Sequence, residues 1–121
     1  MKRELELIRK IILSIEDSES AWAPRIMPFD VYTAAQIGYH SWLVVDAGLA
    51  RGGETTHMGS DGPEAVISSL TWTGHEFAEA ARNETRWNTA IAVVREKTGT
   101  VTVAVLTQVL VNLMKQALGL P

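Results

Sequence analysis

The stretch YHSWLVVDAGLARGG, residues 39–53, constrains the fold more than any other part of the chain. A helix is expected over about Gln36–Asp46, with four apolar side chains on its core-facing side, namely Ile37, Leu43, Val44 and Ala47. Gly48 is placed to end this helix, because glycine tolerates the left-handed conformation that follows many helix C-termini. A strand then begins at Leu49. The sequence therefore predicts a helix that turns directly into a hairpin.

The segment before this stretch predicts a helix, a linker and a short second helix. Apolar residues repeat at helical spacing over Lys2–Glu16, and the core-facing stripe comprises Leu5, Leu7, Ile8, Ile11, Ile12 and Ile15. Pro24 and Pro28 forbid a regular helix through the linker DSESAWAPRIMP, which we expect to be anchored by Trp22, Ile26 and Met27. Asp30 is placed to cap a short helix over about Val31–Ala35, since its carboxylate can accept from the free amides of a first turn.

The segment after the stretch predicts a hairpin followed by helices. The glycine-rich run ARGGETTHMGSDGPEA is typical of a loop or hairpin tip, and VISSLTW, residues 66–72, resumes strand character. Thr73 is placed to cap a helix over GHEFAEAAR. Asn83 or Thr85 separates that helix from the next one, RWNTAIAVVREK, which Gly99 ends.

A helix-turn-helix followed by a two-stranded hairpin is the order of elements in a winged helix, in which the hairpin is the wing. We therefore expect a mainly α (α+β) fold, a winged helix-turn-helix with additional C-terminal helices. Hydrophobic residues make up 46% of the chain and charged residues 21%, which excludes a largely disordered protein. One domain is expected over residues 1–121, with a core of about 1–82 and a C-terminal helical extension of about 85–119.

Several stretches taken together resemble the family known as domain of unknown function 2513, which is found in bacterial and phage genomes. They are the start MKRELELIRKIILSIE, the centre YHSWLVVDAGLA, the motif LTWTGHEFAEAARNETRWN and the apolar last helix. LTWTGHEF beside RNETRW is the most specific part, and the resemblance covers nearly the whole chain. It implies a winged-helix fold and a phage or prophage origin, and it supplies no catalytic or ligand-binding residues. AGLA and LTWTGHEF also resemble the segments that flank the wing in winged-helix transcription regulators.

The residues predict no enzymatic activity, no metal site and no cofactor. The histidines, His40, His57 and His75, include no pair at the four-residue spacing of a helical zinc site. HEFAE begins like a zinc-protease motif, but Glu79 stands where its second histidine would be. The glycine-rich loop lacks the ending of a phosphate loop, and no serine lies in a nucleophile elbow. We expect His75 at a helix start, and His40 as a partly buried helix residue that makes one hydrogen bond.

Double-stranded DNA is the first partner that the expected fold suggests, because a recognition helix fits the major groove. The helix around residues 36–45 would enter the groove, and the wing would grip the backbone. The candidate DNA-binding residues are Gln36, Tyr39, Ser41 and Trp42, expected to be exposed on the helix, Arg51 on the wing, and Arg25, with Lys2 and Arg3 as further backbone contacts. The charge argues against this partner, because residues 21–84 hold three basic and eight acidic side chains.

A protein partner is the alternative that the sequence leaves open. Aromatic residues are favoured anchors at protein interfaces. Trp42 is the best placed of the tryptophans for such a role, since Trp22 and Trp72 are expected in the core. The same fold would then act as an adaptor that does not bind DNA.

The last helix, about Val103–Leu118, is apolar over much of its circumference, so it either packs within the chain or joins two chains in a homodimer. No apolar run reaches the ~18 residues that a membrane span needs. The chain has no cysteine, which is compatible with a reducing compartment. We therefore expect a cytoplasmic protein with no membrane partner.

Overall fold

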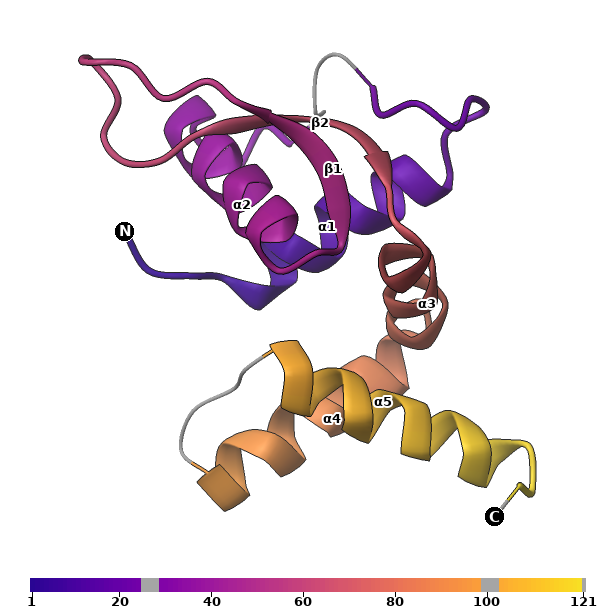
Figure 1. The fold of residues 1–121 in the computed structure, drawn as a ribbon. Coiled ribbons are helices and arrows are strands. Elements are labelled where there is room, and N and C mark those ends of the chain that lie inside the picture. The colour runs from indigo at the N-terminus through magenta and orange to yellow at the C-terminus, as the bar shows by residue number, and fades with distance from the viewer. Residues whose placement is uncertain (25–28, 99–102, 121) are drawn as a thin grey trace. The chain divides into compact units, whose positions relative to one another are not determined.

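A computed structural model describes residues 1–24, 29–98 and 103–120 (Figure 1). Within these residues the elements are α1 (Leu5–Glu16), α2 (Ala34–Asp46), β1 (Ala50–Glu54), β2 (Ala65–Leu70), α3 (Trp72–Ala81), α4 (Glu84–Thr98) and α5 (Val103–Ala117). The chain divides into two compact units, Met1–Glu76 and Phe77–Pro121, and the boundary falls inside α3. The mixed α+β class is confirmed, with β1 and β2 forming a two-stranded antiparallel sheet.

α1 buries the apolar stripe that the sequence predicted. Its buried hydrophobic residues are Leu7, Ile8, Ile11, Ile12 and Ile15. The helix begins at Leu5 and not at Lys2, because the residue before it, Glu4, has an extended backbone and serves as the N-cap. In the first unit, α1 packs against α2 and β2.

α2 is one continuous helix, and this corrects the prediction of two helices in the region. The short helix over Val31–Ala35 does not form, and Asp30 caps nothing; Thr33 is the N-cap instead. The Thr33 side chain accepts from the Gln36 amide at 3.1 Å, and the Gln36 side chain accepts from the Thr33 amide at 2.8 Å. This reciprocal capping box satisfies two amides that a helix start would otherwise leave free. α1 and α2 are therefore joined by a long linker, and residues 17–24 and 29–33 of it contain no helix.

The turn from α2 into the hairpin follows the sequence prediction. Gly48 has a φ of 78°, the left-handed conformation that a side chain disfavours. Its amide donates to Val45 at 3.0 Å, and the Leu49 amide donates to Val44 at 3.0 Å. These two bonds make the Schellman C-cap, in which the free carbonyls of the last turn find partners. The strand that follows begins at Ala50.

The hairpin is bent by a bulge. Arg51 pairs with Ser69, whereas the next residue, Gly52, pairs with Ile67, so Ser68 is the extra residue on β2. The Ser68 hydroxyl donates to the Arg51 carbonyl at 3.0 Å, and its own carbonyl accepts from the Ala23 amide at 2.8 Å. The linker is thus joined to β2 by a backbone hydrogen bond at the bulge. The tip between the strands extends beyond them in Figure 1.

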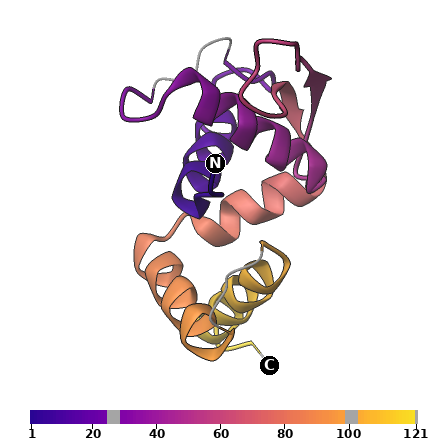
Figure 2. The same cartoon turned by 90° about the vertical axis from the view of Figure 1, so that its left-hand side faces the viewer.

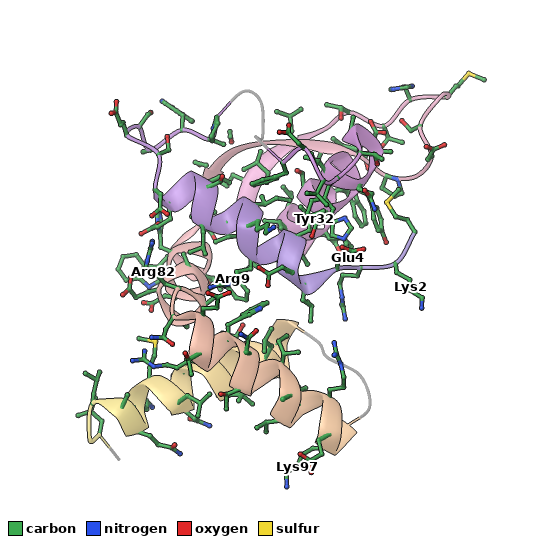
Figure 3. The ribbon with its side chains drawn as sticks, turned by 180° about the vertical axis from the view of Figure 1, so that it is seen from behind. Lys2, Glu4, Arg9, Tyr32, Arg82 and Lys97 are labelled. Atoms are coloured by element: carbon green, nitrogen blue, oxygen red, sulfur yellow. The ribbon has the colours of Figure 1, made fainter. Side chains whose placement is uncertain are left out.

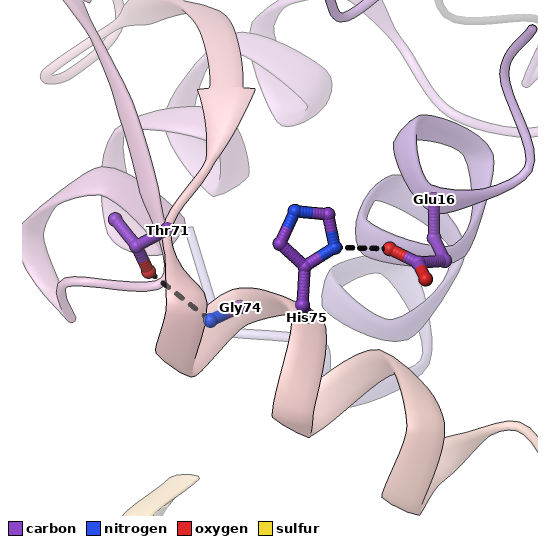
Figure 4. Close-up of polar contacts among 4 residues, drawn as sticks. All are labelled: Glu16, Thr71, Gly74 and His75. Carbon is purple, nitrogen blue, oxygen red and sulfur yellow. Dashed lines mark hydrogen bonds and ion pairs between the residues drawn. The ribbon is translucent and has the colours of Figure 1, made fainter. Parts of the chain in front are cut away.

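α3 starts where the chain passes close to the α2–hairpin turn. The prediction of Thr73 as the cap is wrong, because the helix begins at Trp72, two residues before the predicted first residue Gly74. The Thr71 hydroxyl accepts from the Gly74 amide at 3.1 Å instead (Figure 4). The same hydroxyl donates to the Gly48 carbonyl at 2.6 Å. A Cβ at Gly74 would overlap the Leu49 carbonyl oxygen, so only glycine permits this approach.

The second unit consists of the end of α3 with α4 and α5, and α5 packs against α4 (Figure 2). Asn83 separates α3 from α4, as predicted, and its side chain accepts from the Arg86 amide at 2.9 Å. Phe77 and Trp87 meet edge to face, with ring centroids 6.1 Å apart. The buried side chains of α4 and α5 are Trp87, Ala90, Val94, Leu106 and Leu110. The predicted helix end at Gly99 lies outside the described residues.

Candidate functional site

The outer side of α2 was the predicted recognition surface, and Gln36 at its start has a structural task. Both the amide and the side chain of Gln36 are engaged in the capping box with Thr33. The side-chain carbonyl is therefore already used within the helix, and base contact would require breaking the cap.

Tyr39 and Trp42 lie one above the other on the half-buried side of α2. Their rings are nearly parallel, at 8°, with centroids 6.4 Å apart. The Trp42 indole nitrogen donates to a carboxylate oxygen of Glu54, the last residue of β1, at 2.9 Å. The structure thus brings Trp42 to the hairpin, and the nearest charge to this aromatic pair is acidic.

Ser41 is not available on this surface. Only 4% of the residue is exposed, so the prediction of an exposed Ser41 is wrong. The physical reason is that α2 packs on α1 on one side and on both strands on another, which buries more of its circumference than a surface helix would bury.

His40 holds α2 to the start of α1. The ring is 1% exposed, and its Nε2 accepts from the Glu4 amide at 2.8 Å. Because a backbone amide can only donate, the ring hydrogen lies on Nδ1, which donates to the Gln36 carbonyl at 2.7 Å. The prediction of a partly buried histidine with one hydrogen bond is wrong, since His40 is fully buried and makes two.

The basic residues of the first unit include two with side-chain contacts and two that are exposed. Arg9 pairs with Glu6 at 3.2 Å, and the Lys10 ammonium lies 5.7 Å from the centre of the Tyr32 ring. Arg51 is exposed on β1 beside the bulge, and Lys2 is exposed at the N-terminus. Arg25, another predicted contact, lies outside the described residues.

Tyr32 and Glu4 meet at the start of α1, as Figure 3 shows. Burial raises the pKa of the Tyr32 hydroxyl, and the negative charges of Glu4 and Glu6, with a hydrogen bond to Glu4, raise it further. The end of the linker is thus tied to the start of α1 by the Tyr32 hydroxyl.

His75 confirms the prediction of a residue at a helix start. Its Nδ1 contacts a carboxylate oxygen of Glu16, at the end of α1 (Figure 4). This contact joins the start of α3 to the end of α1 within the first unit. In the described part of the chain, no group of histidine and acidic residues is arranged to hold a metal ion.

Two exposed tryptophans are the feature that sequence reasoning missed. Trp22 is 68% exposed and Trp72 is 79% exposed, so the prediction that both lie in the core is wrong. Trp22 lies on the linker beside Ala23, whose amide binds β2, and Trp72 is the first residue of α3. β2 ends at Leu70 and Trp72 is already the first residue of α3, so the alternation of side chains along the strand does not decide where Trp72 points.

Comparison with known proteins gives the chain a family. The family model described as "Hypothetical protein (DUF2513)" matches residues 2–100. The chain belongs to this family. It is also 29% identical over 121 residues to an uncharacterised protein of Haemophilus influenzae, covering 98% of this chain and all of that protein. No solved structure matches the chain. None of the described helices of this DUF2513 protein is long and apolar enough to cross a membrane.

Proposed function

We propose that this DUF2513 protein is a protein-binding module of the cytoplasm, without enzymatic activity, built on a winged-helix-like arrangement of α2 and its hairpin. The observation that carries the proposal is the exposure of Trp22 and Trp72 in the first unit. An exposed tryptophan leaves a large apolar surface in water when no partner is bound, which is unfavourable. Tryptophans are also among the residues that contribute most to binding at protein interfaces.

The chemistry of α2 supports a protein partner over a nucleic acid. The helix contains no lysine or arginine, and its outer aromatic residue Trp42 is bonded to Glu54. DNA binding requires neutralisation of phosphates, which lysine and arginine provide. The carboxylate of Glu54 on β1, beside the aromatic pair of α2, repels a phosphate backbone.

Affinity capture tests the proposal. The full chain is used as bait in extract of its host, and bound proteins are quantified by mass spectrometry. We expect a protein that binds the wild-type chain and is lost with the double substitution Trp22→Ala and Trp72→Ala. Met58→Ala is the matched control, because Met58 is fully exposed on the hairpin tip. A protein retained equally by all three baits would remove the tryptophans from the interface.

DNA binding is the second candidate, and the exposed Arg51 on the strand that follows α2 favours it. This guanidinium can reach a phosphate or the minor groove if α2 lies in the major groove. Fluorescence anisotropy with a random duplex at low and moderate salt tests it. If the protein binds DNA, its affinity falls steeply with salt, and Arg51→Ala reduces the slope of log affinity against log salt concentration by about one. Arg95→Ala on α4 is the charge-matched control. Absence of binding at low salt removes this candidate.

A homodimer through the second unit is compatible with either partner. α5 exposes Val105, and Leu118 and Leu120 beyond it are exposed as well. A second copy could cover these side chains, and two-fold symmetry makes such contacts self-complementary. Light scattering after gel filtration measures the mass, and Val105→Glu is expected to convert a dimer to a monomer.

A further inference from the structure

An open pocket of about 580 Å³ lies in the first unit, between the first half of α2, the hairpin and the linker. Three of its lining residues are buried, namely Ser41, Ala65 and Ile67. Further apolar side chains line it, namely Pro24, Phe29, Ala34, Ile37 and Val66. The volume is that of a small-molecule site, and walls of this kind bury the apolar part of a ligand.

Among the described lining residues of the pocket, the charged side chains are acidic. Asp30 and Glu64 line it, and no lysine or arginine lies among its described lining residues. Neither carboxylate forms a salt bridge with any residue that the structure describes. The Glu64 chain lies against Gly38 on α2, where an added Cβ would come within 3.2 Å of its Cγ. The Glu64 side chain therefore packs on a glycine at the wall of the pocket.

We propose that this pocket binds a small organic cation, an ammonium group on an apolar body. The apolar body would lie on Ile37 and Ile67, and the ammonium would pair with Asp30 and Glu64. Glu64 is half-buried and Asp30 is exposed, so the lower local dielectric constant strengthens the attraction of a cation mainly at Glu64. The same charges repel an anion, and a neutral ligand of equal size gains nothing from them.

Titration of the isotope-labelled full chain, followed by nuclear magnetic resonance, tests the class of ligand. The probes are 2-phenylethylamine, protonated at neutral pH, the neutral 2-phenylethanol and the anionic phenylacetate, which share one apolar body. We expect the amine to shift the amides of Gly38, Ser41, Ala65 and Ile67 in a saturable way, and to bind at least about tenfold more tightly than the alcohol. Equal shifts from amine and alcohol, or shifts elsewhere in the chain, would overturn the proposal.

Charge-matched variants test the residues. Asp30→Asn with Glu64→Gln removes both pocket carboxylates, and Asp61→Asn with Glu76→Gln removes two exposed carboxylates outside the pocket. We expect the first pair to weaken amine binding about tenfold and the second pair to leave it within about twofold. Gly38→Ala, which pushes the Glu64 chain aside, is expected to weaken the amine in the same direction. If both double substitutions weakened amine binding equally, the amine would be attracted by net charge alone, and the proposal would be overturned.

Discussion

The first unit uses its large ring side chains in two opposite ways. On the inner side of α2, His40 is buried and both ring nitrogens are bonded, to Glu4 and Gln36. On the linker and at the start of α3, Trp22 and Trp72 are mostly exposed. The first arrangement fixes α2 to α1, and the second leaves most of each indole in solvent. Stability and recognition are therefore expected to separate cleanly by mutation.

The largest effect is expected at His40. His40→Ala removes a buried ring, leaves the Glu4 amide without its acceptor and opens a cavity, and we expect a loss of about 2–4 kcal/mol in the free energy of unfolding. Urea denaturation measures it. His57→Ala on the exposed tip is the control, with a change expected within about 0.5 kcal/mol. Equal effects of the two substitutions would show that His40 does not hold the fold.

The next effect is expected at the close approach of α3 to the α2–hairpin turn. Gly74→Ala places a methyl group on the Leu49 carbonyl oxygen, so we expect a loss of about 1–3 kcal/mol. Gly62→Ala, where nothing lies within 4 Å of the added carbon, is the matched control. Thermal unfolding of the two variants compares them, and a stable Gly74→Ala protein would contradict the approach described above.

A smaller effect is expected from Tyr32 at high pH. The pKa of Tyr32 is raised above its ordinary value of 10.0 in the folded protein, so its contribution to stability is complete below that pH and is lost as the pH rises through the folded pKa. Tyr32→Phe should therefore flatten the alkaline decline in unfolding free energy. Tyr39→Phe should leave the alkaline decline in unfolding free energy unchanged. A decline that is flattened by Tyr39→Phe and not by Tyr32→Phe would contradict the assignment to Tyr32.

The smallest effect on the fold is expected from the exposed tryptophans. Trp22→Ala with Trp72→Ala removes side chains that are mostly in solvent already, so the free energy of unfolding should change by less than about 1 kcal/mol. Urea denaturation beside the affinity capture compares the two properties in one protein. A large loss of stability would place these residues in the core and remove the contrast with His40.

The sequence predicted the parts of the fold that depend on local pattern. The α1 stripe, Gly48 at the end of α2 and Asn83 at the start of α4 follow from periodicity and from the backbone freedom or capping chemistry of single residues. The hairpin after α2 was predicted for the same reason. The winged-helix arrangement itself stays a prediction.

The errors arose where a distant contact or a shift of phase decided the outcome. Aspartate and threonine are both favoured at helix N-caps, so the sequence alone could not choose between Asp30 and Thr33. The reciprocal bonds between Thr33 and Gln36 place the cap at Thr33. Trp72 was expected in the core at the end of the strand-like run VISSLTW, but β2 ends at Leu70 and Trp72 begins α3. Periodicity alone did not place Ser41 inside, since α2 is covered from two sides by α1 and the hairpin.

Site-specific photo-crosslinking in the host cell tests most directly whether the exposed tryptophans form a protein interface. The full chain carries benzoylphenylalanine at position 22, 72 or 58 in separate experiments, and adducts are identified by mass spectrometry. We expect positions 22 and 72 to yield an adduct with the same second protein, and position 58, which is more exposed than either, to yield none. Adducts only with DNA, or the same adducts from position 58, would contradict a protein interface built on Trp22 and Trp72.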